Sequence, residues 1–333
     1  MAEIKQISPA QRAQNFASAT RQNFHMLPSQ TVTQLGTTVQ FTYPKSRLLS
    51  KTFVKFEVEC SQAVNNLTDF TPYELVRRIS LSLNNGFEPF VISGRDLAIL
   101  NMLRMNSFTI PSSKEGLVTG KGTNRIVFVL EMENTLNQRD ASSLILLQNE
   151  STQVTLSIDI ATSAPEQFGT VNKIVVTPCL QTYTIPNYAE AFPDLSCIKL
   201  VKSRTETLSS SGEHVLKLDV GTIYRKLVFY VTDENGNGVD LINSNIELIY
   251  NTADTPISID PVMLKMKNTS DYGVAFPTGM YVFDFSGYGG VMSGYAGSRD
   301  FIDTERLSEF WVRFSTSEGC KVTTIQENIS RLR

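Results

Sequence analysis

The sequence predicts an all-β protein of two eight-stranded jelly rolls, with short helical insertions and a helical arm at the N-terminus. Three observations support this prediction. Many short segments alternate apolar and polar residues, an ordered set of features occurs twice, and residues 8–30 differ from everything after them. A chain of 333 residues, 41% of them hydrophobic, is long enough for two domains of ordinary size.

The first predicted element is a helix within residues 8–30. Ser8 can cap a helix and Pro9 suits the first helical position, and apolar residues then recur at roughly helical spacing as far as Phe24. The apolar stripe is thin, and a helix of about 14 residues is marginal alone in water. We therefore expect this helix to pack against another surface, as part of an arm that comprises residues 1–34.

Alternating segments follow the arm. In residues 53–60, Val54, Phe56, Val58 and Cys60 share one face, which predicts a half-buried strand. Similar segments, each bounded by turn residues, lie at 77–83, 125–132, 154–160, 173–183, 226–231, 280–285 and 310–315. Many short strands of this kind are typical of β-sandwiches.

The repeated set of features has three parts in a constant order. A tyrosine and a basic pair enter a strand that ends at an Asn-Gly turn, a helical segment follows, and another strand comes after it. The paired segments are 71–86 and 220–236, 96–103 and 260–266, and 125–132 and 280–285. The offset between copies is roughly 150 to 165 residues, which indicates a duplicated unit.

The boundary between the two units is expected near Pro186 and Pro193, because paired prolines break any regular element. The predicted domains are the arm at 1–34, a first jelly roll at 35–186 and a second at 187–333. One large β domain with a coincidental internal similarity is the alternative.

Composition excludes several classes of protein. No apolar run approaches the roughly 18 residues of a membrane span and no apolar leader is visible, so we expect synthesis in the cytosol. A net charge of -3 without any Lys/Arg block argues against direct binding of nucleic acid. The cysteines are widely spaced, which fits reduced thiols, at Cys60, Cys179, Cys197 and Cys320.

No catalytic, cofactor-binding or metal-binding residues are predicted. His25 and His214 are the only histidines, too few for a metal-binding jelly roll or a convincing nucleophile–histidine pair. Residues 233–240 resemble the start of a calcium loop, but Ser244 stands where the bidentate Glu is required. An Asn-Gly turn explains the same residues.

Two further patterns have simple structural interpretations. Glu57 with Glu59, and Glu131 with Glu133, have the spacing of a carboxylate pair in a glycosidase, but we expect polar strand faces that meet solvent or a neighbouring subunit. The glycine- and tyrosine-rich residues 286–297 lack a phosphate-loop lysine and predict a flexible contact loop.

Four short segments resemble the double jelly-roll major capsid protein of tectiviruses, tailless bacteriophages whose protein shell encloses a lipid membrane. These segments are residues 7–11, 67–79, 227–236 and 276–282. Each is weak alone, but their order is that of the family and they span the arm and both domains. Loops such as 84–87 look short, so the resemblance predicts reduced outer towers.

The resemblance implies a homotrimer in which three chains, each with two jelly rolls, form a six-sided capsomer of an icosahedral shell. Its implied partners are copies of itself, a vertex (penton) protein and the internal membrane, with no enzymatic activity and no cofactor. The implied location is the virion, with assembly in the host bacterial cytoplasm.

We predict that residues 1–26 contact the membrane and neighbouring capsomers. The cations of this segment are opposed only by Glu3, and each cation near anionic lipid is worth roughly 1 kcal/mol. The predicted contact residues are Arg12, Phe16, Arg21 and Phe24. The alternative is that the helix packs on its own domain.

The competing function is a virion spike or a carbohydrate- or receptor-binding β-sandwich. A spike would usually carry fibrous repeats and a coiled coil, and neither is visible. A sugar-binding domain is expected to expose tryptophans, whereas the single Trp311 lies in an alternating segment.

Overall fold

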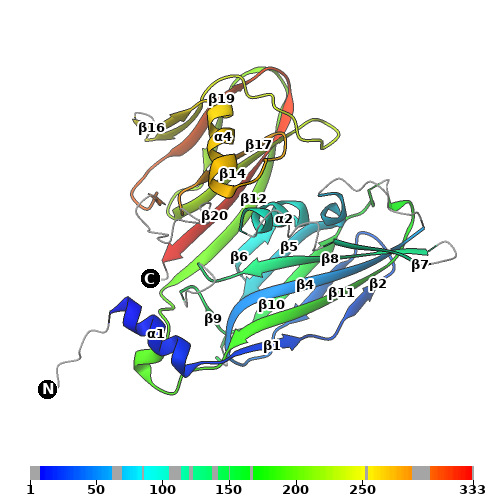
Figure 1. Ribbon diagram of the computed structural model, residues 1–333, viewed down its shortest axis with the longest axis vertical. Coiled ribbons are helices and arrows are strands. Elements are labelled where there is room, and N and C mark those ends of the chain that lie inside the picture. The colour runs from blue at the N-terminus through cyan, green and yellow to red at the C-terminus, as the bar shows by residue number, and fades with distance from the viewer. Residues whose placement is uncertain are drawn as a thin grey trace. The chain divides into compact units, whose positions relative to one another are not determined.

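The computed structural model of the protein describes residues 8–61, 70–84, 86–104, 114–119, 123–136, 142–149, 151–165, 168–251, 254–286 and 301–331. The chain forms two compact units (Figure 1). Unit 1 contains residues 1–102, 108–199 and 331–333, and unit 2 contains residues 103–107 and 200–330. The predicted boundary between residues 186 and 187 lies before the observed division at residues 199 and 200.

Unit 1 consists of two antiparallel sheets. Its strands are β1 (Gln22–Met26), β2 (Gln30–Val32), β3 (Thr38–Thr42), β4 (Leu48–Cys60), β5 (Val76–Leu83), β6 (Phe87–Ile92), β7 (Lys114–Thr119), β8 (Thr123–Glu133), β9 (Ile145–Leu146), β10 (Val154–Ile160) and β11 (Val171–Tyr183). One sheet has the order β1-β11-β4-β8-β7, with β2 also beside β11 and β9 beside β4. The other has the order β6-β5-β10-β3.

Short helices connect these strands. Helix α1 (Pro9–Ala19) precedes β1, and the 3-10 turn η1 (Thr71–Leu75) leads into β5. Helix α2 (Gly94–Arg104) follows β6, and the turn η3 (Ala189–Ala191) follows β11.

Unit 2 also consists of two sheets. Its elements are β12 (Cys197–Leu208), β13 (Gly212–Leu218), β14 (Ile223–Thr232), β15 (Ile246–Tyr250), β16 (Asp254–Ile259), α4 (Pro261–Tyr272), β17 (Met280–Asp284), β18 (Ile302–Asp303), β19 (Phe310–Thr316) and β20 (Cys320–Arg331). One sheet has the order β12-β20-β14-β17, with β18 also beside β14. The other has the order β13-β19-β15-β16.

Both units have the same strand order. The main strands of unit 1 are β2, β3, β4, β5, β6, β8, β10 and β11, and those of unit 2 are β12 to β17, β19 and β20. Numbered from one to eight along the chain, they form sheets with the orders 1-8-3-6 and 2-7-4-5 in each unit. Each unit is therefore an eight-stranded jelly roll, as predicted.

Two of the three predicted correspondences between the halves are confirmed. Helices α2 and α4 both follow the fifth strand, and β8 and β17 are both the sixth. The first correspondence is wrong, because β5 is the fourth strand of its unit and β14 is the third. The tyrosine, the basic pair and the turn are local features that mark where a strand begins and ends. The position of that strand in the sheet depends on the strands that pair with it, which are distant in sequence.

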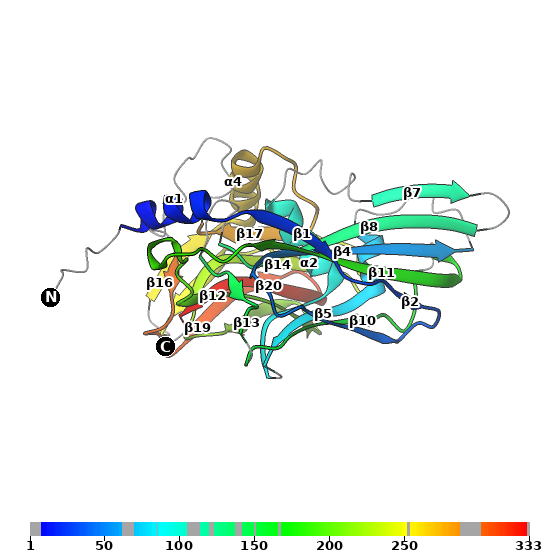
Figure 2. The same ribbon diagram turned by 90° about the horizontal axis from the view of Figure 1, so that it is seen from below.

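The predicted arm at 1–34 includes part of the first jelly roll. Residues of β1 pair with β11 from Gln22 opposite Tyr183 to Met26 opposite Cys179, and β2 pairs with the same strand nearer its start. Figure 2 shows α1 running directly into β1 along the edge of this sheet. Between the two short strands lies Pro28, opposite the part of β11 that contains Pro178. Prolines cannot donate to a β ladder, which explains the interruption.

The core of unit 1 confirms the predicted face of residues 53–60. Val54, Phe56, Val58 and Cys60 are all buried, and the Phe56 ring stacks on Phe128 with centroids 4.9 Å apart. Burial alternates along β4 from Phe53 because one face of the sheet meets the core.

Strand β14 differs from its prediction. The alternation in 226–231 predicts burial on one face, but all ten residues of β14 are buried. The apolar side chains Leu227, Phe229 and Val231 join the unit 2 core, and Arg225 and Lys226 find ionic partners instead of water.

Candidate interaction surfaces

Helix α1 begins where the sequence indicates but ends before Phe24, because residues from Gln22 onward form β1 and pair with β11. The Ser8 hydroxyl accepts a hydrogen bond from the Gln11 N–H at 3.2 Å, and Pro9 opens the helix. The helix ends at Ala19, with Thr20 donating its hydroxyl to the Phe16 carbonyl at 2.7 Å. Helix α1 contacts η3, also in unit 1.

Phe16 is not available for contact with lipid or a neighbour. Its side chain is only 6% exposed and packs with Leu48 and Leu144. Its ring meets Tyr183 edge-on, with centroids 5.4 Å apart. The prediction that Phe16 is a contact residue is therefore wrong, because the thin apolar stripe of the helix packs against its own unit.

The other three predicted contact residues lie nearer the surface. Arg12 is half-buried, and its charge adds to hydrogen bonds from Ser196 that hold the pKa of Asp194 below its ordinary value. Arg21 is exposed, and its backbone N–H donates to Thr184 Oγ1 at 2.9 Å. Phe24 is 63% exposed.

Met26 belongs to the same surface, although no pattern in the sequence indicates it. It is 62% exposed and lies two residues beyond Phe24, so both side chains are on one side of β1. In the described part of the chain β1 is the last strand of its sheet. We call Phe24 and Met26, together with the exposed Arg21 in the segment just before the strand, the β1 surface.

The pair Glu131 and Glu133 has a different environment from the one expected. Glu131 and Glu133 are 4% and 2% exposed, so the expectation that they face solvent is wrong. Lys51 Nζ lies 2.8 Å from Glu131 and 3.0 Å from Glu133. Glu57 is paired with Lys55 and Arg125 nearer the surface. These carboxylates serve ion pairs within unit 1, an arrangement unlike an acid–base pair around a substrate.

Residues 233–240 form a turn, as the Asn-Gly interpretation expects. The Asp233 carboxylate accepts from the Asn237 backbone N–H at 2.8 Å, and Gly236 has φ of 86°. Asp240 accepts instead from the Gly279 N–H at 2.7 Å and from Tyr281. Among the described residues, no three His, Cys, Asp or Glu side chains are grouped as metal ligands.

The two histidines lie in different units. His25 is exposed on β1, while His214 Nε2 lies 3.1 Å from Thr316 Oγ1 on the neighbouring strand. Of the predicted contact loop 286–297, only Ser286 belongs to the described residues.

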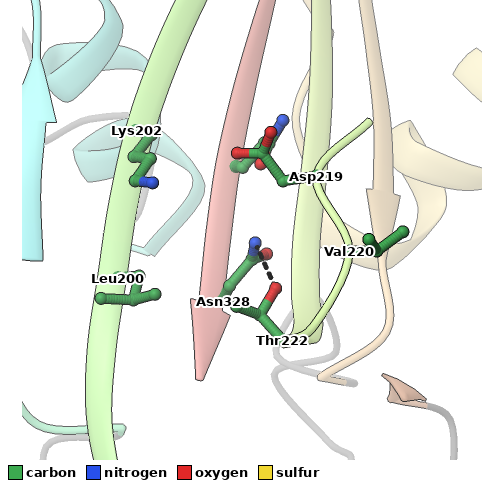
Figure 3. Close-up of a pocket in the computed structure, with 7 residues that line it drawn as sticks. Leu200, Lys202, Asp219, Val220, Thr222 and Asn328 are labelled. Carbon is green, nitrogen blue, oxygen red and sulfur yellow. Dashed lines mark hydrogen bonds between the residues drawn. The ribbon is translucent and has the colours of Figure 1, made fainter. Parts of the chain in front are cut away.

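A pocket of about 250 Å³ lies in unit 2 between β12, β20 and the segment before β14 (Figure 3). Its lining residues are Leu200, Lys202, Asp219, Val220, Thr222, Gln326 and Asn328. Asn328 Nδ2 donates to Thr222 Oγ1 at 3.1 Å, which ties the segment to β20. The lining offers one cation and one anion but no histidine or thiol, so it can hold a small polar group without an evident nucleophile.

A buried polar cluster fastens α4 to the neighbouring strands. Lys226 Nζ lies 3.1 Å from Asp284 Oδ2, and both side chains are 5% exposed. Tyr272 of α4 donates its hydroxyl to the same oxygen. Burial by itself would raise the pKa of Asp284, but Lys226 and the donors Ser286 and Tyr272 hold that pKa below its ordinary value.

This cluster predicts a defined pH dependence. A carboxylate with a lowered pKa in the folded state stabilises the protein above its unfolded value of about 3.9, and this contribution is lost as pH falls through the folded pKa. Asp284→Asn should therefore cost about 2 to 3 kcal/mol at pH 7, and the difference from wild type should shrink below about pH 4. Urea unfolding at several pH values measures this difference. A gap that is constant from pH 7 to 3 would contradict it.

The fold is that of solved viral capsid proteins along almost the whole chain. The STIV MCP, from Sulfolobus turreted icosahedral virus, matches with a TM-score of 0.70 and 17% identity over 93% of this chain and 97% of that chain. VP54 of PBCV-1 matches with a TM-score of 0.70 and 10% identity over 94% and 95%. The major capsid protein P2 of bacteriophage PM2 matches at 0.58 with 11% identity over 94% and 98%. This chain has the double jelly-roll capsid protein fold.

This chain shares its fold with those capsid proteins but few of their residues. The sequence matches no model of a known protein family and no curated protein. The predicted resemblance is therefore confirmed at the level of the fold. No helix in the described ranges is long and apolar enough to cross a membrane.

Proposed function

We propose that this protein is the major capsid protein of a membrane-containing icosahedral virus, and that three copies form each capsomer. The observation that carries the proposal is that one chain contains two jelly rolls of the same strand order and matches the STIV MCP over 93% of its length. Three such chains provide six similar lobes, which fill a six-sided lattice position with a closed threefold ring. The chain acts as a structural subunit of the virion and not as an enzyme.

The β1 surface is the proposed contact with the internal membrane and with neighbouring capsomers. No Asp or Glu occurs between residues 4 and 56, so the start of the chain is cationic. Arg21 provides an exposed charge and Phe24 and Met26 provide apolar contacts, whereas Arg12 lies near Asp194 of its own unit. Each such contact is weak, but three per trimer and many trimers per shell add up through avidity.

The proposed partners are copies of the chain, a vertex protein and an anionic membrane surface, without direct contact to nucleic acid. A spike or carbohydrate-binding module is less well supported. Trp311 is half-buried on β19 and not an exposed platform, and the STIV MCP and the major capsid protein P2 of PM2 match 93% and 94% of this chain.

The first test is the mass of the purified protein in solution. We expect native mass spectrometry or light scattering to give three times the chain mass of 37.1 kDa at micromolar concentration. A stable monomer under these conditions would contradict the proposed capsomer.

A second test addresses the membrane contact. The double variant Arg21→Glu with Phe24→Ser should bind vesicles containing phosphatidylglycerol several-fold more weakly than wild type, and the difference should narrow as salt is raised. Lys217→Glu reverses an exposed charge in unit 2 and should leave vesicle binding unchanged. Point variants are preferable to deletion of residues 1–26, which would also remove Phe16 from the core. Equal binding by all three proteins would exclude the β1 surface as the membrane contact.

A further inference from the structure

Helix α4 exposes an apolar surface on unit 2. Val262, Met263 and Met266 are 65%, 67% and 69% exposed. Residues three and four positions apart are neighbours on a helix, so Met266 adjoins both Met263 and Val262 and the three side chains form one continuous surface. We call these three residues the α4 patch.

The opposite side of α4 is firmly held. Asp260 caps the helix by accepting from the N–H groups of Val262 and Met263 at 2.8 and 3.1 Å. Leu264 is 2% exposed in the unit 2 core, and Tyr272 is bonded to Asp284. Helix α4 lies beside β17 (Figure 1). The patch is therefore presented on a rigid element.

Helix α2 provides an internal comparison, because it occupies the same position in unit 1 as α4 does in unit 2. None of the residues of α2 is exposed. Leu97, Ile99 and Leu103 are at most 3% exposed. The same element of the fold thus has no exposed residue in one unit and an exposed apolar side in the other.

We propose that a second copy of the chain covers the α4 patch in the assembled capsomer. The inference rests on the proposed trimer. In a ring of six jelly rolls from three chains, equivalent positions in the two units have equivalent surroundings. A surface that the chain itself covers in unit 1 then corresponds in unit 2 to a surface covered by the next chain. The contact is heterologous, since α4 meets a different part of the neighbouring copy.

The size of the patch fits this role. Three side chains, each about two-thirds exposed, present on the order of 300 Å² of apolar surface, which is comparable to the largest patch on a typical monomer. Such a patch can form the centre of an interface that buries about 800 Å² per partner. Methionine side chains adapt their shape to a partner surface.

The charges beside the patch favour a protein partner over an anionic lipid surface. Lys265 is paired with Asp240, and Lys267 is paired with Asp271 at 2.5 Å. The rim is therefore balanced in charge, which suits the polar rim of a protein interface. An anionic membrane would instead be attracted by cations whose charge is not balanced by nearby carboxylates.

The test compares the oligomeric state of two variants with that of wild type. Met263→Glu combined with Met266→Glu should give a folded monomer where wild type is a trimer, with an unchanged far-UV circular dichroism spectrum. Val215→Glu is the matched control, because Val215 is a 50% exposed apolar side chain on β13 of the same unit. This control should remain a trimer.

Brief peroxide oxidation of the wild-type protein gives a second measurement that needs no substitution. Met263 and Met266 should be oxidised at least tenfold more slowly in the trimer than in protein diluted to the monomer, while Met280, which is 0% exposed, stays protected in both. A trimer formed by the Glu variant, or rapid oxidation of Met263 and Met266 in the trimer, would overturn this inference and leave the proposed function intact. Protection that appears only with vesicles would assign the patch to the membrane. A monomeric wild type would instead refute the proposed capsomer itself.

Discussion

Lys51→Ala is expected to lower the free energy of unfolding by about 4 kcal/mol. Lys51 lies between Glu131 and Glu133, at 2.8 and 3.0 Å, with 10% of its side chain exposed. The further cation Lys199 is 3.8 Å from Glu133. Removing Lys51 leaves two buried carboxylates with one cation nearby, and an uncompensated buried charge is strongly destabilising.

Lys55→Ala is the matched control for this prediction. Lys55 lies on the same strand and pairs with Glu57, but its side chain is 40% exposed. Because exposed ion pairs are worth little, the loss should be below about 1 kcal/mol. Urea unfolding of both variants measures the difference. If the two variants lost similar amounts of unfolding free energy, burial would not explain the importance of the ion pairs that Lys51 forms.

Gly279→Ala is expected to cost about 4 kcal/mol, the second large effect. Gly279 has φ of 79°, and an added Cβ would lie 2.3 Å from the Val231 carbonyl oxygen and 2.8 Å from the Val239 nitrogen. The backbone cannot easily move away, because the Gly279 carbonyl accepts from the Val231 N–H at 2.8 Å and its own N–H donates to Asp240 at 2.7 Å.

Gly236→Ala separates the two causes of this loss, which are backbone strain at positive φ and overlap of the added Cβ with neighbouring atoms. Gly236 has a similar φ of 86°, but nothing lies within 4 Å of an added Cβ. Its replacement should therefore cost only the backbone strain, about 1 kcal/mol. Thermal and urea unfolding of both variants give the comparison. If Gly236→Ala were as destabilising as Gly279→Ala, close packing at Gly279 would have no role.

Tertiary contacts of this kind also explain why residues 233–240, which resemble the start of a calcium loop, include acidic residues and glycines. Asp240 joins the N–H of Gly279 to Tyr281 and Lys265, and Gly238 approaches the Thr278 carbonyl too closely for any Cβ. The acidic and glycine residues of 233–240 are thus used to join two segments of unit 2. A linear motif cannot distinguish this use from ligation of a cation.

The sequence by itself determined the class of fold and the places where several elements begin. Period-two alternation correctly predicted the strands at 154–160 and 310–315, since alternate side chains of a strand point to opposite faces. The cap Ser8 correctly predicted the start of α1, because capping is a local interaction between residues two or three positions apart. The helical segment predicted at 260–266 likewise lies at the start of α4.

Only the tertiary structure decided which polar and apolar side chains are covered. Glu131 and Glu133 alternate like solvent-facing residues, yet they are buried with Lys51 from a different strand. Phe16 and Phe24 belong to one short segment, but only Phe16 is buried, against residues more than thirty positions away. Alternation reports which side chains share a face, whereas burial depends on what packs against that face, and for these residues the packing partners are distant in sequence.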